Sequence, residues 1–241
     1  MNIYFLTNGN LKTFYTAVYF ALTQGGKITS DKEIQLALDD KIVKIEYDRQ
    51  KCEKVQNAVN CCDKFAEEDI ILALRSGEND KEQKVFNYVK RLVTAKSPIK
   101  KRLSLNEVVE FNDLLYKITG ELHRLKGLLR FTECNNGILY APCSPDNNII
   151  DLLACHFKKR LSNEKFVIHD IGRKLATIYD GNSLATGNVG EAEIYVSERE
   201  KEFVNLWKKY YKFINIESRP HEKQMKGSMP VRYWNFLPEK Q

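Results

Sequence analysis

The stretch Gly120-Glu-Leu-His-Arg-Leu-Lys-Gly-Leu-Leu-Arg-Phe131 decides the fold, because the spacing of apolar residues changes within it. Up to Gly127 the leucines recur at helical intervals, and a glycine at that place is typical of a helix end. From Leu128 onward the pattern predicts a strand. The histidine and three cations of the stretch are either charges that favour a helix C-terminus or part of a surface that binds an anion.

A long helix precedes this point. Ser104-Leu-Asn-Glu107 has the spacing of a capping box, in which the serine and glutamate side chains satisfy backbone groups of the first helical turn. We expect the helix to run to Gly127. Its buried seam follows alternating steps of three and four residues: Val108, Phe111, Leu115, Ile118, Leu122 and Leu125.

The seam separates the charges of the opening stretch. His123 and Lys126 lie on one flank of the helix, whereas Arg124 projects nearly opposite, where a cation near the C-terminus offsets the helix dipole. Arg130 would follow on the strand. The question is whether His123, Lys126 and Arg130 converge on an anion.

A sheet is expected after the helix. Its strands cover residues 128–134, 137–141, 165–170 and 175–180. Asn135-Asn136-Gly137 is a strong hairpin turn between the first two, because Asn and Gly tolerate positive φ. The last two form a second hairpin around Gly172, and a helix over residues 146–161 separates the hairpins. The pattern therefore predicts a largely antiparallel four-stranded sheet.

The N-terminal part is rich in helices. Short strands are expected at Ile3–Leu6 and 42–47, and a helix over 11–24 should end at Gly25-Gly26. The stretch Ser97-Pro98-Ile-Lys-Lys-Arg102 combines a chain breaker with a basic run and is the expected internal boundary. The predicted fold class is α+β, with a helix-rich region over residues 1–96 and, over residues 97–241, a small sheet packed by helices.

Composition limits the classes of protein. With 43% hydrophobic and 11% aromatic residues the chain should fold, and its formal charge of +6 permits an anionic partner without requiring one. The N-terminus does not resemble a signal peptide, and no apolar run is long enough to span a bilayer. We therefore expect a cytoplasmic protein with no membrane association.

The six cysteines are expected to be free thiols in a reducing compartment. No Cys-x-x-Cys pair is present, so buried or incidental thiols are favoured over a zinc or iron-sulfur site. Phosphate-binding loops, nucleophile elbows and His-Glu-x-x-His motifs are also missing from the sequence. We expect no bound metal and no cofactor.

A cation falls within the expected buried stripe of the helix over 146–161. At 100° per residue, His156 and Arg160 share that stripe with Phe157. Arg160 would then either pair with an internal carboxylate, such as Asp170 or Asp180, or line a pocket for a phosphate or nucleobase. The structural role is favoured for both residues.

His169 and Asp170 end one strand, but they cannot be assumed to form a dyad because neighbouring strand residues point to opposite faces. His169 has a pKa suited to acid-base catalysis, and Asp170 could equally cap the loop before Gly172. Together with His156 they are the candidate catalytic residues, although a structural role is again favoured.

The C-terminal region mixes cations with aromatic residues. A second capping box, Ser197–Glu200, should start a helix with four large apolar residues on one face, namely Phe203, Trp207, Tyr210 and Ile214. Beyond it, the tail offers cations for phosphates and offers Tyr233 and Trp234 for stacking on bases. Docking of these aromatics onto the core is the favoured alternative, which leaves the cations free to face a partner.

Several motifs together resemble one bacterial family. They are His123-Arg-x-Lys-Gly-x-x-Arg-Phe131, Leu139-Tyr-Ala-Pro142, His156-Phe-x-x-Arg160, Ile168-His-Asp170, Ile178-Tyr-Asp-Gly181, Trp207-x-x-Tyr210 and Met229-Pro-x-Arg-Tyr-Trp-x-x-Leu-Pro-Glu239. The resemblance is to DNA metabolism or DNA repair proteins that contain a domain of unknown function. It covers residues 104–239, and Cys155 and Val231 depart from the usual pattern.

The resemblance implies a role linked to nucleic acid. In that family the domain is encoded beside a radical-SAM protein described as a DNA modification or repair protein, and it also occurs fused to uracil-DNA-glycosylase-like domains. We therefore expect an accessory protein that binds DNA or another nucleic acid and acts with a radical-SAM partner. An enzyme that acts on a base or phosphodiester, and a protein-interaction module without nucleic-acid contact, are the alternatives.

The candidate nucleic-acid-binding residues share a cationic or stacking side chain. They are His123, Arg124, Lys126, Arg130, Arg160, Arg173, Arg219, Lys226, Arg232, Tyr233 and Trp234.

Overall fold

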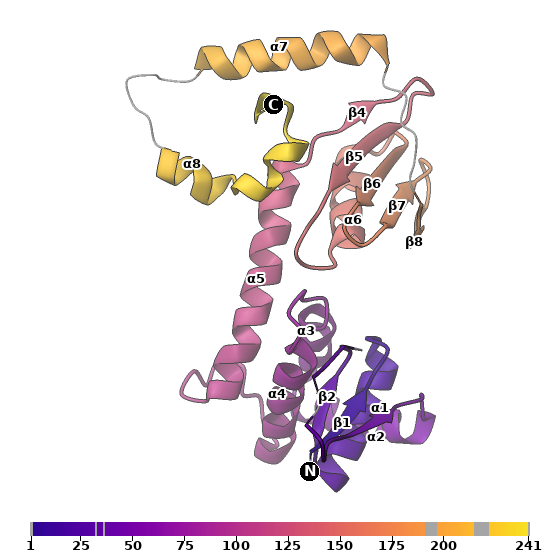
Figure 1. The fold of residues 1–241 in the computed structure, drawn as a ribbon, viewed down its shortest axis with the longest axis vertical. Helices are drawn as coiled ribbons and strands as arrows, with labels where there is room; N and C mark the ends of the chain where they lie inside the picture. Colours follow the sequence, from indigo (N-terminus) through magenta and orange to yellow (C-terminus); the bar gives the residue numbers. More distant parts are fainter. Residues whose placement is uncertain (1, 32, 36, 191–196, 215–221, 241) are drawn as a thin grey trace. The chain divides into compact units, whose positions relative to one another are not determined.

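The computed structural model describes residues 2–31, 33–35, 37–190, 197–214 and 222–240 (Figure 1). The chain divides into two compact units, unit 1 over Met1–Thr119 and unit 2 over Gly120–Gln241. Each unit has its own sheet. The boundary predicted near Ser97 was drawn from sequence pattern, and it stays a prediction.

Unit 1 contains a parallel sheet covered by helices. Its elements are β1 (Ile3–Leu6), α1 (Leu11–Gln24), β2 (Lys27–Thr29), β3 (Lys41–Lys44), α2 (Arg49–Cys62), α3 (Ala66–Ala73), α4 (Lys81–Ala95) and the first part of α5 (Asn106–Leu128). The sheet has the order β2-β1-β3, and both neighbours run parallel to β1. The helix expected over 11–24 has these bounds and ends at Gly25, whose φ of 76° suits glycine.

The core of unit 1 is aromatic and aliphatic. The rings of Tyr88 in α4 and Phe111 in α5 stack with centroids 3.8 Å apart. Val108 and Leu115 of the predicted α5 seam belong to the same buried cluster as Phe111. Burial of such side chains stabilises the fold by about 1.5–3 kcal/mol each.

Unit 2 contains a mixed sheet. Its elements after α5 are β4 (Thr132–Glu133), β5 (Leu139–Cys143), α6 (Ile150–Arg160), β6 (Phe166–Asp170), β7 (Leu175–Tyr179), β8 (Leu184–Asn188), α7 (Glu198–Ile214), α8 (Glu222–Ser228) and the short 3₁₀ helices η1 (Val231–Phe236) and η2 (Pro238–Lys240). The strand order is β4-β5-β6-β7-β8. β5 and β6 are parallel because α6 connects them as a crossover, and the other pairs are antiparallel.

One face of this sheet carries α6, which packs against β6, β7 and β8 (Figure 1). Phe166 and Ile168 of β6 are fully buried, and so is Leu153 of α6. The ring of Phe131 meets those of Phe157 and Phe166 edge to face, at centroid distances of 4.9 and 5.7 Å. The start of unit 2 is therefore fixed onto the same core as α6.

The predicted single, largely antiparallel four-stranded sheet is wrong, because the described residues form a three-stranded parallel sheet and a five-stranded mixed sheet. β2 has only three residues, and β8 contains Gly187 and is mostly exposed, so neither has the alternating apolar pattern of a strand. The strand expected from Leu128 begins at Thr132. Gly127 does not end the helix, because a single glycine is tolerated inside one.

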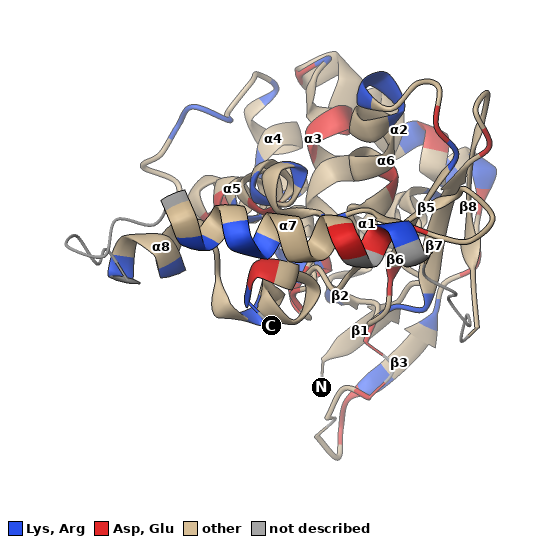
Figure 2. Ribbon diagram, turned by 90° about the horizontal axis from the view of Figure 1, so that it is seen from above, with Lys and Arg blue, Asp and Glu red and all other residues tan. Residues whose placement is uncertain are grey.

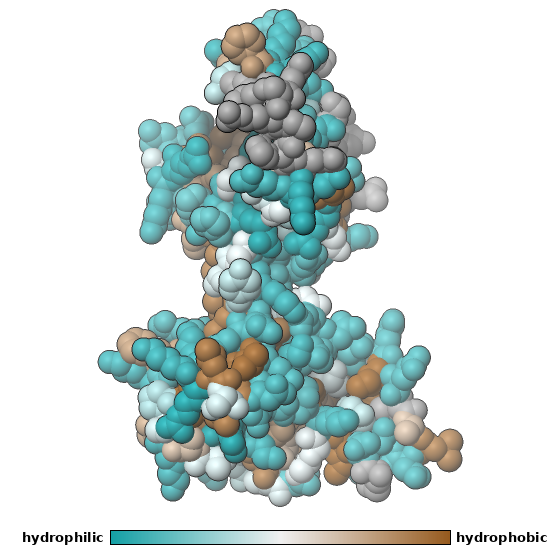
Figure 3. All heavy atoms as spheres, turned by 90° about the vertical axis from the view of Figure 1, so that its left-hand side faces the viewer, coloured by the Kyte–Doolittle hydropathy of each residue, from teal (hydrophilic) through white to brown (hydrophobic). Residues whose placement is uncertain are grey.

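The face of the molecule drawn in Figure 3 is mostly polar. Figure 3 shows hydrophilic residues over most of the face in view, with hydrophobic patches between them. Each helix within the described ranges is too short or too polar to cross a lipid bilayer.

Candidate functional site

A basic patch forms where α5 and α6 both end. Lys126 of α5 and Lys159 and Arg160 of α6 lie close enough to His156 to act on its charge. Partial burial and these three cations lower the pKa of the His156 imidazole, because each disfavours its protonated form. We call Lys126, His156, Lys159 and Arg160 the basic patch.

Arg160 is exposed, so the prediction that it lies on the buried stripe was wrong. α6 turns Leu153 and Phe157 into the core, and Arg160 follows on the last turn, where the chain leaves the sheet. The two carboxylates considered as its partners bond other groups. Asp170 pairs with Arg173, and Asp180 accepts backbone N–H bonds from Asn182 and Ser183 at 2.8 and 2.7 Å. Arg160 has no ion-pair partner within the described residues.

A cavity of about 810 Å³ lies beside the basic patch. The residues that line it come from the end of α5, β4, the end of α6, α7 and η2: Gly127, Arg130, Phe131, Thr132, Arg160, Glu200, Phe203, Val204, Leu206, Trp207, Tyr210 and Pro238. Gly127 and Arg160 both line the cavity. Gly127 directly follows Lys126 in the sequence and Arg160 directly follows Lys159, so the cavity adjoins the basic patch. The volume is within the range of about 300–1,000 Å³ that small-molecule sites occupy.

Arg130 closes one side of the cavity, and its charge is neutralised there. Its Nη2 atom donates to Glu239 Oε1 at 2.6 Å, and its Nη1 atom donates to the carbonyl of Gly127 at 2.9 Å. The guanidinium also stacks over the Trp207 ring at 5.6 Å, while Trp207 Nε1 donates to Glu239 Oε2 at 3.0 Å. The cluster of Arg130, Trp207 and Glu239 thus ties η2 and α7 to the end of α5.

Burial alone would raise the pKa of the Glu239 carboxyl, but the hydrogen bonds from Arg130 and Trp207 outweigh it and the pKa is lowered. The carboxylate has no exposed side-chain surface. It is therefore held ionised between a cation and an indole N–H.

α7 carries charges of both signs. Figure 2 shows acidic and basic residues in its first turns and basic residues in its second half. The sequence of that second half contains Lys208, Lys209 and Lys212, which complement the helix dipole. The predicted capping box is half present, because Ser197 Oγ accepts from Glu200 N at 3.1 Å while the Glu200 carboxylate accepts from Glu133 N at 3.2 Å.

The candidate catalytic residues contact different groups. His169 Nδ1 lies 2.8 Å from the hydroxyl of Tyr140, on the opposite sheet face from Asp170. Asp170 is fully buried and accepts from Arg173 at 2.9 Å. His156 belongs to the basic patch. Neither His156 nor His169 lines the cavity.

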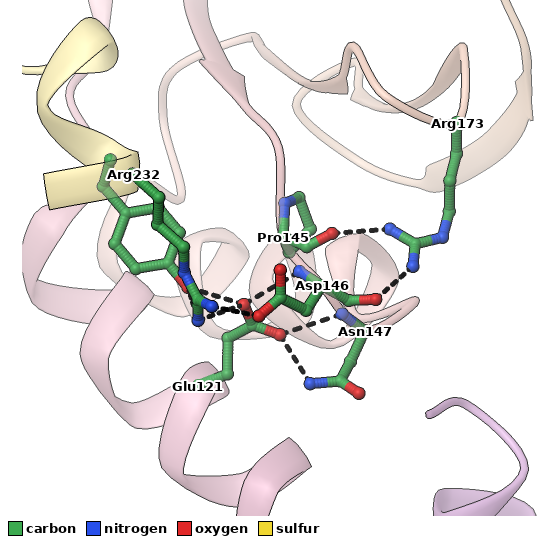
Figure 4. A network of polar contacts seen from close by, with 7 residues as sticks. Glu121, Pro145, Asp146, Asn147, Arg173 and Arg232 are labelled. Carbon is green, nitrogen blue, oxygen red and sulfur yellow. Dashed lines mark hydrogen bonds and ion pairs between the residues drawn. The ribbon is translucent and has the colours of Figure 1, made fainter. Parts of the chain in front are cut away.

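A separate polar network joins the tail to the loop before α6 (Figure 4). Glu121 is 1% exposed, and its two carboxylate oxygens accept from the backbone N–H groups of Asp146 and Asn147 at 2.9 Å. Arg232 bonds Glu121 and Asp146, and Arg173 donates to the carbonyls of Pro145 and Asp146. Arg173 and Arg232 therefore have partners within the fold.

The aromatic tail docks. Tyr233 is 1% exposed, and its hydroxyl donates to Glu121, so it is part of the same network. Burial, followed by the neighbouring Glu121 carboxylate, raises the Tyr233 pKa. Trp234 is half-buried, and its Nε1 atom donates to the carbonyl of Met229 at 3.0 Å. This arrangement fits the docking alternative for both rings.

The remaining candidates are scattered. His123 is exposed on α5, and Arg124 is half-buried with no hydrogen-bond partner for its Nε atom within the described residues. Lys226 lies on α8, and Arg219 lies outside the described residues. Lys126 joins the basic patch, whereas Arg130 pairs with Glu239.

Comparison with known protein families matches a region that includes residues of both units. Residues 79–239 match the model of a family described as "Domain of unknown function (DUF4130)". The chain belongs to this family. The DUF4130 region spans the basic patch, the cavity and the polar network, and it begins two residues before α4 of unit 1. No curated protein and no solved structure matches the chain.

Sequence reasoning missed part of the DUF4130 site. Lys159 was not singled out, and Phe203, Trp207 and Tyr210 were expected on one helix face without a binding role. The helical spacing of Phe203, Trp207 and Tyr210 predicts that they share an apolar face, and this signal could have pointed to them. The spacing does not predict whether another element covers that face. Phe203, Trp207 and Tyr210 are 54%, 39% and 53% exposed.

The described part of the chain holds no group of three or more His, Cys, Asp or Glu side chains placed to bind a metal ion. All six cysteines lie within it and are free thiols. Burial raises the pKa of Cys143 and Cys134, which makes these two poorer nucleophiles near neutral pH.

Proposed function

We propose that unit 2 is a nucleic-acid-binding module, and that the protein positions nucleic acid for an enzymatic partner. The observation that carries this proposal is the basic patch beside an aromatic cavity. Lys126, Lys159 and Arg160 present positive charge on one surface, as binding to a phosphate backbone requires. Exposed aromatic rings next to such a surface suit unpaired bases.

The geometry favours binding over catalysis. An acid-base pair should meet at one pocket with hydrogen-bond reach between its members. His156, His169 and Asp170 contact different groups, and neither histidine lines the cavity. The partner, a radical-SAM protein acting in DNA modification or repair, is implied by the family resemblance and is part of the proposal.

The test is the salt dependence of binding. The full-length protein is titrated into fluorescent single- and double-stranded oligonucleotides between about 50 and 200 mM salt, with anisotropy as the readout. The patch variant Lys126→Gln/Lys159→Gln/Arg160→Gln should bind more weakly. Its slope of log K against log salt should fall by up to about 3, roughly one for each phosphate that the variant no longer neutralises.

The control removes the same charge elsewhere. Lys44, Lys101 and Lys174 are exposed and lie outside the patch, so Lys44→Gln/Lys101→Gln/Lys174→Gln has the same net charge as the patch variant. It should keep most of the affinity and the slope. Absence of binding by the wild-type protein at low salt, or equally weakened binding in the two variants, would overturn the proposal.

A further inference from the structure

The cavity beside the basic patch has features that phosphate binding does not need. Three aromatic side chains of α7 line it, namely Phe203, Trp207 and Tyr210. Each of these side chains is at least 39% exposed. The rings of Trp207 and Tyr210 lie 5.7 Å apart and are tilted by 35°, so they offer neighbouring faces. Such exposed rings are costly in water and gain free energy when a planar apolar group covers them.

The charges at the cavity indicate the sign of its occupant. Arg130 and Glu239 form an ion pair at 2.6 Å and cancel each other. Glu200 also lines the cavity, and its carboxylate accepts from the backbone N–H of Glu133 at 3.2 Å. Arg160 lines the cavity with no ion-pair partner in the described part of the chain, and Lys159 adjoins it. A planar group joined to an anion matches this pairing of aromatic faces with a cation. An apolar protein side chain would use the aromatic faces but leave Arg160 unmatched.

We propose that the cavity binds one unpaired nucleobase of a single strand, stacked on Trp207 or Tyr210, with Arg160 on the adjoining phosphate. The inference rests on the proposed function, because the backbone on either side of that base would cross the basic patch. It predicts a preference for single strands over duplexes, whose bases are already stacked on each other.

The chain offers a direct optical test. It has two tryptophans, Trp207 and Trp234, so Trp234→Phe leaves Trp207 as the sole indole reporter. Three probes are titrated into the full-length variant: a single-stranded oligonucleotide, an abasic strand of equal length, and inorganic polyphosphate. We expect all three to bind and only the strand with bases to quench the Trp207 fluorescence.

Substitutions separate stacking from structure. Trp207→Ala should weaken binding of the normal strand by about 5- to 150-fold, the usual effect of removing a stacking partner, and leave the abasic strand unaffected. Trp207→Phe loses the hydrogen bond to Glu239 but keeps a ring, so it should retain most of the affinity. Tyr210→Ala is a second variant that removes the neighbouring ring of the stacking pair. The matched control is Phe213→Ala, because Phe213 is 90% exposed on the same helix outside the cavity.

The outcomes distinguish the two proposals. If none of the three probes binds, the proposed function fails and the base site fails with it. If the normal and abasic strands bind equally and neither quenches Trp207, the base site is overturned while nucleic-acid binding stands. Unchanged affinity of Trp207→Ala and Tyr210→Ala for the normal strand would also overturn it and leave the aromatic rings to a protein partner.

Discussion

At the scale of residues, the basic patch depends on an interaction between two helices. The charge of Lys126 on α5 acts on the imidazole of His156 on α6. Lys126→Gln removes one of the three positive charges that lower the His156 pKa. The pKa should therefore rise toward the ordinary histidine value of about 6.5. The measurement is an NMR pH titration of the histidine rings, with His156→Gln to assign the resonance among the four histidines.

Lys174→Gln is the control for this titration, because Lys174 lies in the turn after β6, at the far end of that strand from the end of α6. It should leave the His156 pKa unchanged. An oligonucleotide that neutralises the patch should raise the His156 pKa in the wild-type protein. An unaltered pKa in Lys126→Gln would show that Lys126 does not face His156.

At the scale of elements, η2 depends on one carboxylate. Glu239→Gln keeps the shape but removes the charge that accepts from Arg130 and Trp207, and we expect a loss of about 1.5–3 kcal/mol in the free energy of unfolding near pH 7. Because the folded pKa of Glu239 is lowered, its contribution is complete above the unfolded value of about 4.3 and is lost as pH falls through the folded pKa.

Urea unfolding at a series of pH values checks this prediction. The difference between wild type and Glu239→Gln should be largest near neutral pH and shrink below about pH 4. Glu164→Gln is a suitable control, because Glu164 is exposed in the loop after α6, and it should change stability little. A difference that is independent of pH would mean that the carboxylate charge is not the stabilising feature.

Elements differed in how far the sequence predicted them. The sequence correctly predicted the seam of α5 and the helix over 11–24, because a long 3.6-residue period of apolar residues is a strong signal. β2 and β8 were missed, since three residues or a glycine-containing exposed strand carry almost no period-two pattern. The hairpin at Asn135-Asn136-Gly137 was found, because Gly137 adopts the positive φ that its turn chemistry predicts.

At the scale of the whole molecule, only unit 2 should respond to nucleic acid. Hydrogen exchange of the full chain with and without a saturating oligonucleotide should show protection in the last turns of α5, in α6 and in α7, which carry the patch and the cavity. The amides of β1, β2 and β3 in unit 1 should exchange at unchanged rates. Protection confined to unit 1 would contradict the assignment of the interface.

The sequence by itself determined the helical seam of α5, the turn at Asn135-Asn136-Gly137 and membership of the DUF4130 family, since each depends on residues close in the chain or on a linear motif. Only the tertiary structure decided which cations meet. Lys126 and Arg160 are 34 positions apart in the sequence. They come close in space because the crossover helix α6 ends near the end of α5. Pairing of Arg130 with Glu239 likewise joins distant segments, because charge and burial depend on neighbours in space and not on local periodicity.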